Sequence, residues 1–240
     1  MSIATLFCRE IPDPGKTAML DADESHHAMR VRRFRAGDSV RLIDGHGATG
    51  GGEIVAGGRG HKITVEIRER CTQPLPSRLI HVAAAVPKGG RQAILFDMLT
   101  QLGMSSFTPL RCERSVVRPG THTPARWRRI CLEACKQSGN AYLPTLHDEC
   151  TPDQAVEFMC ARNVKCFIAH PVSPGAPTRY PRARPVGLLI GPEGGFTEAE
   201  VHAALGKGAV PVGFGVHTLR IETAAVAWFS ALRLNQLDKD

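Results

Sequence analysis

The chain alternates between short apolar runs and amphipathic segments. Nearly unbroken apolar runs span residues 79–86 and 164–169, and a third begins at Val186. Such runs are typical of strands buried on both faces of a parallel sheet. Residues 89–102 and 221–236 instead carry apolar side chains at helical spacing. The pattern therefore predicts an α/β fold: a βα-alternating, mostly parallel sheet with helices on both faces.

Each predicted helix carries one apolar stripe, which we expect to face the core. The stripe residues are Leu95, Met98, Leu99 and Leu102 in the helix over residues 89–102; Trp127, Ile130, Cys131 and Ala134 in the helix that Thr123 and Pro124 begin; Val201, Ala204 and Leu205 in the helix after Thr197; and Ile221, Ala225, Trp228, Phe229 and Leu232 in the last helix. Exposed aromatic and aliphatic residues on the last helix would be a reason to expect a homodimer.

The first part of the chain has the pattern of a small β domain. Residues 38–44 alternate between apolar and polar side chains, and residues 51–55 and 62–68 are predicted as further strands. Residues 45–50 match G-x-G-x-x-G, but a strand rather than a helix is predicted next, so we reject a dinucleotide site there. We expect a compact antiparallel β-barrel over residues 1–71.

A proline-rich joint at residues 72–77 is the best candidate for a domain boundary. The chain has 240 residues, enough for a small domain and a larger one. We therefore predict a β domain over residues 1–71 and an α/β domain over residues 72–240.

Composition narrows the classes of partner and compartment. The net charge of +7 favours polyanions such as nucleic acid, although a merely basic protein has the same composition. The eight cysteines form no C-x-x-C pair, so we expect neither a zinc site nor a disulfide framework. No signal peptide and no apolar run near the ~20 residues of a membrane span are recognisable, which predicts a cytoplasmic protein without a membrane partner.

A glycine turn follows the apolar run that begins at Val186. Residues 191–195 read Gly-Pro-Glu-Gly-Gly, and Thr197 with Glu200 forms a capping box that begins a helix. Strand, turn and capped helix describe the carboxyl end of a sheet strand, where open α/β folds bind ligands. A tight connection that binds nothing is the alternative on spacing alone.

A second stretch, residues 214–225, again follows a strand-like run and begins a helix. The pair of stretches, Gly-Pro-Glu-Gly-Gly-Phe-Thr at 191–197 and Phe-Gly followed by Leu-Arg-Ile-Glu-Thr-Ala at 219–224, resembles the cofactor-binding signature of RsmE-type 16S rRNA uridine-N3 methyltransferases. The resemblance extends over nearly the whole chain, including Pro87-Lys88 and the Gln-Ser-Gly of residues 137–139.

This resemblance implies a SPOUT-class α/β domain tied in a trefoil knot and preceded by a PUA-like β-barrel that binds RNA. It also implies S-adenosyl-L-methionine as the methyl donor, a homodimer, and 16S rRNA or the small ribosomal subunit as the partner. The residues that the resemblance places around the cofactor are Leu189, Ile190, Gly191, Pro192, Glu193, Gly194, Gly195, Phe214, Gly215, Thr218, Leu219 and Thr223.

Arg220 and Glu222 are the candidate catalytic residues. Arg220 would hold a charged uracil oxygen or a phosphate through its planar guanidinium group. Glu222, with Glu193 as the second choice, would orient or accept the N3 proton. An ion pair between Arg220 and Glu222 at the start of a helix is the alternative without the resemblance.

Basic side chains outside the predicted core form a candidate RNA surface. The proposed RNA-binding residues are Arg30, Arg32, Lys88, Arg111, Arg114, Arg118 and Arg128. A solvated charged face explains the arginines of the predicted helix equally well.

The chain departs from the family pattern at three places. His217-Thr218 replaces an Arg-Ile pair, Gln101 replaces a glutamate, and Asn140 replaces an arginine. These departures keep two alternatives open, a divergent SPOUT methyltransferase of another RNA position and a non-catalytic RNA-binding factor. An ordinary doubly wound nucleotide enzyme would need a phosphate loop, which the sequence lacks.

Overall fold

The computed structural model describes residues 3–29, 34–58, 61–118, 120, 123–170, 184–213 and 217–234. The chain divides into two compact units, Met1–Leu75 with Leu132–Leu143, and Pro76–Cys131 with Pro144–Asp240. The first unit therefore includes a short segment from later in the chain, which no local sequence pattern indicated. The domain boundary between residues 71 and 72 stays a prediction.

The first unit contains a five-stranded sheet with the order β1-β3-β4-β5-β2. Its strands are β1 (Ala4–Phe7), β2 (Thr17–Met19), β3 (Ser39–Ile43), β4 (Ala48–Gly58) and β5 (His61–Thr72). β1 is parallel to β3 and the other ladders are antiparallel. Closure of this sheet into a barrel stays a prediction.

Alternation in β3 correctly predicted the core side of this sheet. Val40 and Leu42 are buried in the core cluster of the first unit. Ile43, expected on the polar side, is also buried, because Cys135 and Ala141 from the later segment cover it. The glycines of residues 45–50 run into β4, which begins at Ala48, so the prediction that a strand rather than a helix follows them is confirmed.

A short helix, α1 (Ala22–His27), and the later segment are joined by a buried ion pair in this unit. Asp21 caps α1 by accepting a hydrogen bond from the backbone N–H of Glu24. The carboxylate of Glu24 then accepts two hydrogen bonds from Nζ of Lys136, at 3.0 and 3.1 Å, and a third from the backbone N–H of Phe7. Both charged side chains are buried. Nζ of Lys136 also lies 2.8 Å from Oε1 of Glu133, whereas Lys136 is the cation that compensates the buried Glu24 carboxylate.

The second unit is built on a six-stranded sheet in the order β11-β9-β10-β6-β7-β8, in which every ladder is parallel. Its strands are β6 (Ile80–Ala84), β7 (Ser106–Pro109), β8 (Thr145–Leu146), β9 (Lys165–Ala169), β10 (Val186–Ile190) and β11 (Val210–Val212). Its helices are α2 (Arg91–Gln101), α3 (Thr123–Ser138), α4 (Pro152–Cys160), α5 (Glu198–Gly206) and α6 (Ile221–Leu234). The C-terminal residues of α3 belong to the first unit.

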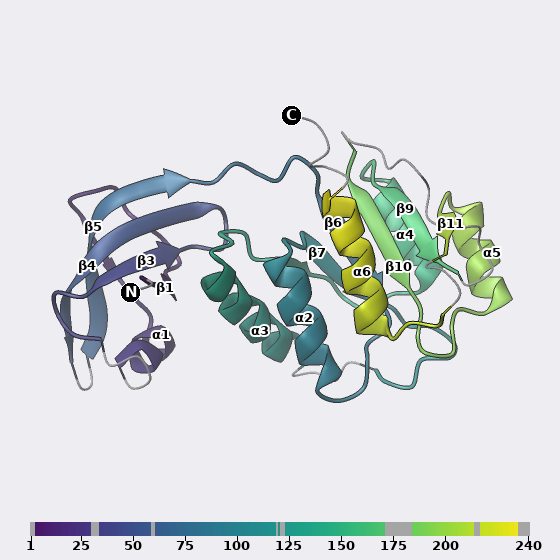
Figure 1. Cartoon of the computed structure of the whole chain (residues 1–240), viewed down its shortest axis with the longest axis horizontal. Coiled ribbons are helices and arrows are strands. Elements are labelled where there is room, and N and C mark those ends of the chain that lie inside the picture. Colours follow the sequence, from purple (N-terminus) through teal and green to yellow (C-terminus); the bar gives the residue numbers. More distant parts are fainter. Residues whose placement is uncertain are drawn as a thin grey trace. The chain divides into compact units, whose positions relative to one another are not determined.

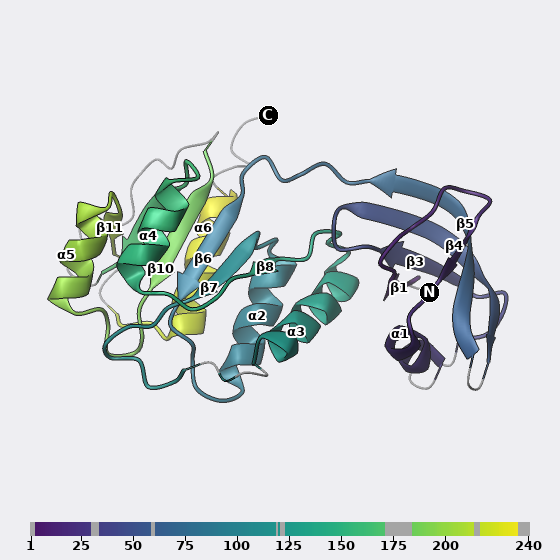
Figure 2. The same ribbon diagram turned by 180° about the vertical axis from the view of Figure 1, so that it is seen from behind.

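Helices cover both faces of the parallel sheet. On one face α6 packs on β6 and β10 and contacts α2, whereas α4 packs on β9 and β10 and contacts α5 (Figures 1 and 2). The predicted α/β arrangement is therefore confirmed, and the trefoil knot stays a prediction. Within the described residues no helix is long and apolar enough to span a membrane.

The predicted core of α2 was wrong at Met98, which is 43% exposed. Its buried stripe is centred on Leu95, Phe96 and Leu99 instead. Phe96 stacks on Trp127 at a centroid distance of 4.6 Å, so this contact rotates the buried face away from Met98. Leu102 is only partly buried, at the end of the helix.

The cores of α5 and α6 also differ from expectation. Leu205 on α5 is exposed rather than buried, and Val201 is half-buried, because the contact of α5 with α4 buries only Ala204 fully. On α6 every predicted stripe residue is buried. The stripe residues therefore supply no exposed apolar surface that would argue for a homodimer, and the homodimer stays a prediction from the family resemblance.

The parallel direction of the strands brings several loops to one edge of the sheet. The backbone N–H of Ala85, just after β6, donates to the carbonyl of Ile190 at the end of β10. The N–H of Leu110, just after β7, donates to the carbonyl of Ala84. The segments that follow β6, β7 and β10 therefore begin side by side, at the carboxyl edge where such sheets bind ligands.

Candidate active site

The glycine turn after β10 is a tight, capped connection, as the sequence predicted. The N–H of Gly195 donates to the carbonyl of Pro192 at 2.8 Å, and Gly195 has a φ of +69°, which favours glycine. Glu200 accepts a hydrogen bond from the N–H of Thr197, while the Thr197 hydroxyl accepts one from the N–H of Glu200. The capping box is therefore confirmed, and it fixes where α5 begins.

Close packing requires a glycine at the start of this turn. A Cβ atom on Gly191 would lie 3.1 Å from the backbone nitrogen of Phe196. Leu189, Ile190, Gly191 and Pro192 are buried, whereas Glu193 and Gly194 are exposed. The turn therefore rests on a rigid base and presents its tip to the surroundings.

The segment after β7 holds this tip in place. Arg114 donates from Nη1 to the carbonyl of Gly194 at 2.8 Å. The backbone N–H of Glu113 donates to Oε1 of Glu200 at 2.8 Å. The guanidinium group of Arg114, proposed from the sequence as an RNA contact, thus positions the glycine turn, and its contact with RNA stays a prediction.

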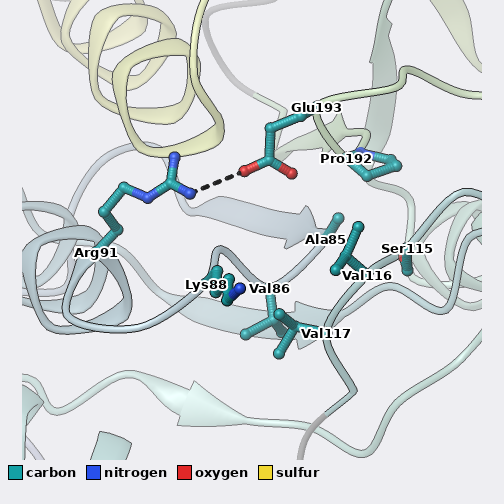
Figure 3. A pocket seen from close by; sticks show the side chains of 9 residues that line it. All are labelled: Ala85, Val86, Lys88, Arg91, Ser115, Val116, Val117, Pro192 and Glu193. Atoms are coloured by element: carbon teal, nitrogen blue, oxygen red, sulfur yellow. Dashed lines mark ion pairs between the residues drawn. The ribbon is translucent and has the colours of Figure 1, made fainter.

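Arg91, at the start of α2, joins the two candidate proton acceptors. Its Nη2 atom lies 3.3 Å from Oε1 of Glu193 (Figure 3). Its Nη1 atom lies 4.0 Å from Oε1 of Glu222. Arg91 was not among the site residues predicted from the sequence. The position of Arg91 shortly after β6 does not predict these contacts, because Glu193 and Glu222 lie far away in the sequence.

Glu222 is a buried carboxylate with unused hydrogen-bonding capacity. Its side chain is only 10% exposed, and within the described part of the chain Oε2 has no hydrogen-bond partner. Buried polar atoms are usually paired, so an unpaired one needs an explanation, and a catalytic role is one such explanation. The arrangement offers an acceptor for a proton or a hydrogen-bond donor.

Arg220 differs sharply from Glu222 in its surroundings. Its side chain is exposed, and no described carboxylate lies within ion-pair distance of it. Its backbone carbonyl accepts from the N–H of Ala224 in the first turn of α6. Glu222 therefore pairs with Arg91 instead of Arg220, which removes the alternative of a simple Arg220–Glu222 ion pair.

A cavity of about 240 Å³ lies against the tip of the glycine turn (Figure 3). Its lining comes from the segments after β6, β7 and β10, and consists of Ala85, Val86, Lys88, Arg91, Ser115, Val116, Val117, Pro192 and Glu193. Two cationic groups, one carboxylate and an apolar wall thus meet in one hollow. Such a combination can hold a polar, flat ligand and move a proton.

The other predicted site residues are distributed as follows. Thr218 and Thr223 are exposed and Leu219 is half-buried, near the start of α6, whereas Phe214 and Gly215 lie outside the described residues. Among the proposed RNA contacts, Lys88, Arg111, Arg118 and Arg128 are exposed, and Arg30 and Arg32 lie outside the described residues. Of the predicted site residues that the structure describes, Lys88, Pro192 and Glu193 line the cavity.

Two of the departures from the family pattern have local structural roles. The side-chain amide of Gln101 donates to Asp97 one turn earlier in α2. Oδ1 of Asn140 accepts from the backbone N–H of Tyr142 in a turn of the first unit. His217 is exposed. Gln101 and Asn140 are thus held by local contacts rather than lining the cavity.

Two family models match this chain. An RNA methyltransferase domain matches residues 73–233, and an RNA methyltransferase PUA domain matches residues 20–67. The first match includes the whole parallel sheet, the glycine turn and Glu222. The second includes β3, β4 and the first part of β5.

Known proteins resemble the chain over most of its length. A ribosomal RNA small subunit methyltransferase E from Synechocystis sp. is 30% identical over 90% of this chain and 73% of its own length. A ribosomal RNA small subunit methyltransferase E from Neisseria gonorrhoeae, solved with bound S-adenosyl methionine, is 25% identical with a TM-score of 0.89, covering 97% of this chain and 98% of its own. A methyltransferase from Legionella pneumophila, solved with bound SAM, is 28% identical with a TM-score of 0.87, covering 98% of each chain.

Proposed function

This chain belongs to the RNA methyltransferase family, and from that premise we propose that it methylates N3 of a uridine in 16S ribosomal RNA. It is an S-adenosylmethionine-dependent enzyme that acts on ribosomal RNA of the small subunit. The observation that best supports the proposed chemistry is the buried Glu222 carboxylate, held by Arg91 beside the glycine turn.

The residues around the turn fit S-adenosylmethionine as the donor. Gly191 leaves no room for a side chain at the base of the turn, and the backbone of the exposed tip is accessible to a ligand. Arg91 with Glu193 and Glu222 carries a net charge of −1, which suits a positively charged sulfonium. When bound, the donor supplies a methyl group bonded to a sulfonium sulfur, which leaves as a neutral thioether. We assign Leu189 to Gly195, Thr218, Leu219 and Thr223 to its binding, with Phe214 and Gly215 from the same loop.

The uridine N3 atom carries a proton that it must lose as the new N–C bond forms. A carboxylate within reach of that proton provides the general base, and the pair of Glu222 and Glu193 supplies two candidates. Glu222 is our first choice because one of its oxygens is buried and unpartnered. In this role it orients the uracil or accepts the proton.

Arg220 is proposed as the group that meets the negative charge on the substrate. Its exposed guanidinium group, free of a carboxylate partner among the described residues, is available to a uracil oxygen or to a phosphate. The negative charge that develops on the ring as N3 loses its proton would be stabilised by such a cation.

RNA is proposed to bind through the PUA-like domain and the basic surface of the α/β domain. The net charge of +7 and the exposed side chains of Lys88, Arg111, Arg118 and Arg128 support this assignment. Because N3 lies on the Watson–Crick edge, the target uridine must be unpaired or flipped out when it is modified. A homodimer is part of this proposal.

Methyl transfer from labelled S-adenosylmethionine to small ribosomal subunits that lack N3-methyluridine tests the proposal. N3 methylation removes the imino donor, so reverse transcription should stop at a single site in 16S rRNA. Incorporation of label without such a stop would contradict N3 as the target and favour another RNA position. Donor binding without any incorporation would contradict small-subunit RNA as the substrate.

A further inference from the structure

The cavity beside the glycine turn overlaps only in part with the residues that we assign to the donor. Most of its lining comes from the segments after β6 and β7, whereas the donor residues follow β10 and β11. Among the described residues the two sets share Pro192 and Glu193. The cavity thus adjoins the donor loop but extends away from it.

The volume of the cavity limits what it can hold. Pockets for drug-sized molecules are usually about 300–1,000 Å³, and this one is about 240 Å³. S-adenosylmethionine combines a purine, a ribose and an amino acid, so it needs a larger site. A single planar ring with one or two polar edges matches the space better.

The walls of the cavity match the two kinds of surface of a nucleobase. Val86, Val116 and Val117 supply apolar contacts for the faces of a ring. Arg91 and Glu193 lie next to each other at its rim, so that a hydrogen-bond donor and an acceptor are presented together (Figure 3). Lys88, which is exposed, supplies a cation at the mouth.

The donor and acceptor types distinguish uracil from cytosine. The Watson–Crick edge of uracil presents a carbonyl oxygen, the N3–H group and a second carbonyl oxygen in a row. Arginine only donates and a carboxylate only accepts, so Arg91 complements a carbonyl oxygen and Glu193 complements N3–H. Cytosine has no proton on N3, so the carboxylate would face a lone pair.

Building on the proposed function, we propose that this cavity is the subsite for the target uracil and that Arg91 is the residue that contacts its carbonyl oxygen. As the N3–methyl bond forms and the sulfur–methyl bond breaks, the electron pair of the broken bond stays on sulfur. The N3 proton goes to one of the two carboxylates that Arg91 holds. Lys88 binds a phosphate beside the flipped nucleotide.

Filling the mouth of the cavity tests its assignment. Val116 is 80% exposed, so Val116→Trp should fold normally while it narrows the entrance. We expect it to raise the KM for RNA about tenfold or more and to leave the Kd for S-adenosylmethionine within about twofold. Leu205→Trp, at an exposed position on α5, is the matched control and should change neither value.

Three outcomes separate this inference from the proposed function. A weaker donor Kd with unchanged KM for RNA would assign the cavity to the donor and overturn the inference. Unchanged values in an active Val116→Trp variant would overturn it as well, with the proposed function intact. A wild-type protein that binds the donor but methylates no uridine N3 would overturn both.

Substitution of Arg91 tests its contact with the ring. Arg91→Ala should lower kcat about a hundredfold, because the uracil and both carboxylates lose their positioning. Added guanidinium ion should restore part of the rate, which a purely structural loss would not allow. Equal kcat values for Arg91→Ala and wild type would overturn the role of Arg91.

Discussion

Oε1 of Glu222 lies 4.0 Å from Nη1 of Arg91, so the start of α6 and the start of α2 meet through a charged pair at the carboxyl edge of the sheet. Nη2 of the same guanidinium group lies 3.3 Å from Glu193 in the glycine turn. One arginine at the start of α2 thus contacts both the start of α6 and the glycine turn. Any change to one of these side chains is expected to alter the placement of the other two.

Glu222→Gln should lower the rate of methyl transfer, since it keeps the size of the side chain but removes its charge. Loss of a general base typically costs about 10²–10⁴ in rate. Single-turnover measurement with saturating donor and RNA reports the chemical step directly. Glu198→Gln, at an exposed position on α5, is the control. Wild-type rate in the Glu222 variant would refute its catalytic role.

Arg220→Ala should lose methylation while donor binding stays largely intact. Because the side chain is exposed and has no described carboxylate partner, its removal should not lower thermal stability. Calorimetric titration with S-adenosylmethionine and a methylation assay on the same preparation check both statements. Wild-type turnover in this variant would contradict the catalytic role of Arg220. Arg162→Ala, which removes an exposed guanidinium group lying over Phe158, serves as the control.

Gly195→Ala should destabilise the protein and weaken donor binding. The residue has a φ of +69°, and an L-residue in this conformation costs about 1–2 kcal/mol. Gly206→Ala, near the end of α5 where a Cβ meets no atom within 4 Å, should instead stabilise by up to about 1 kcal/mol. Urea denaturation of the two variants measures the contrast. Equal changes in the free energy of unfolding for the two variants would show that the backbone conformation of Gly195 is not the cause of the destabilisation.

Lys136→Met should lower the free energy of unfolding by about 3–5 kcal/mol, because it leaves the buried Glu24 carboxylate uncompensated. Lys16→Met, which breaks an exposed ion pair with Asp13, should cost less than about 1 kcal/mol. Adding Glu24→Gln to Lys136→Met should recover much of the loss. Denaturation curves for the four proteins test this, and a small effect of Lys136→Met alone would contradict it.

Burial should make two cysteines unreactive in the native state. Desolvation raises the pKa of Cys112 to about 12 and that of Cys131 to about 11, above the ordinary value of 9.0. At pH 8 an alkylating reagent should therefore modify the exposed Cys71 first, and mass spectrometry of tryptic peptides will show the order. Rapid labelling of Cys112 would contradict this expectation.

The same shifts predict how stability changes at alkaline pH. The folded state keeps these thiols protonated, whereas the unfolded state loses their protons near pH 9. The two thiols therefore make their full contribution to the free energy of unfolding below pH 9. This contribution to the free energy of unfolding should be lost as the pH rises from about 9 towards 12. Chemical denaturation across this range, with Cys131→Ala as comparison, measures the slope.

Local features of this protein were determined by the sequence itself. The strands at residues 80–84 and 186–190, the left-handed Gly195 and the capping box of Thr197 depend on neighbouring residues only. Apolar runs, the conformational freedom of glycine and helix capping each depend on a few neighbouring residues, so they can be recognised in the sequence. The family resemblance rests on these same segments.

Contacts between distant segments were decided only by the tertiary structure. The pairing of Arg91 with Glu193 and Glu222, the cover over Ile43, and the exposure of Met98 depend on which elements pack together. Such contacts involve side chains that are distant from each other in the sequence, and they leave no periodic pattern. The sequence therefore determined where the ligand loop lies and how it turns. The folded sheet, by bringing its strand ends to one edge, decided which charges surround it.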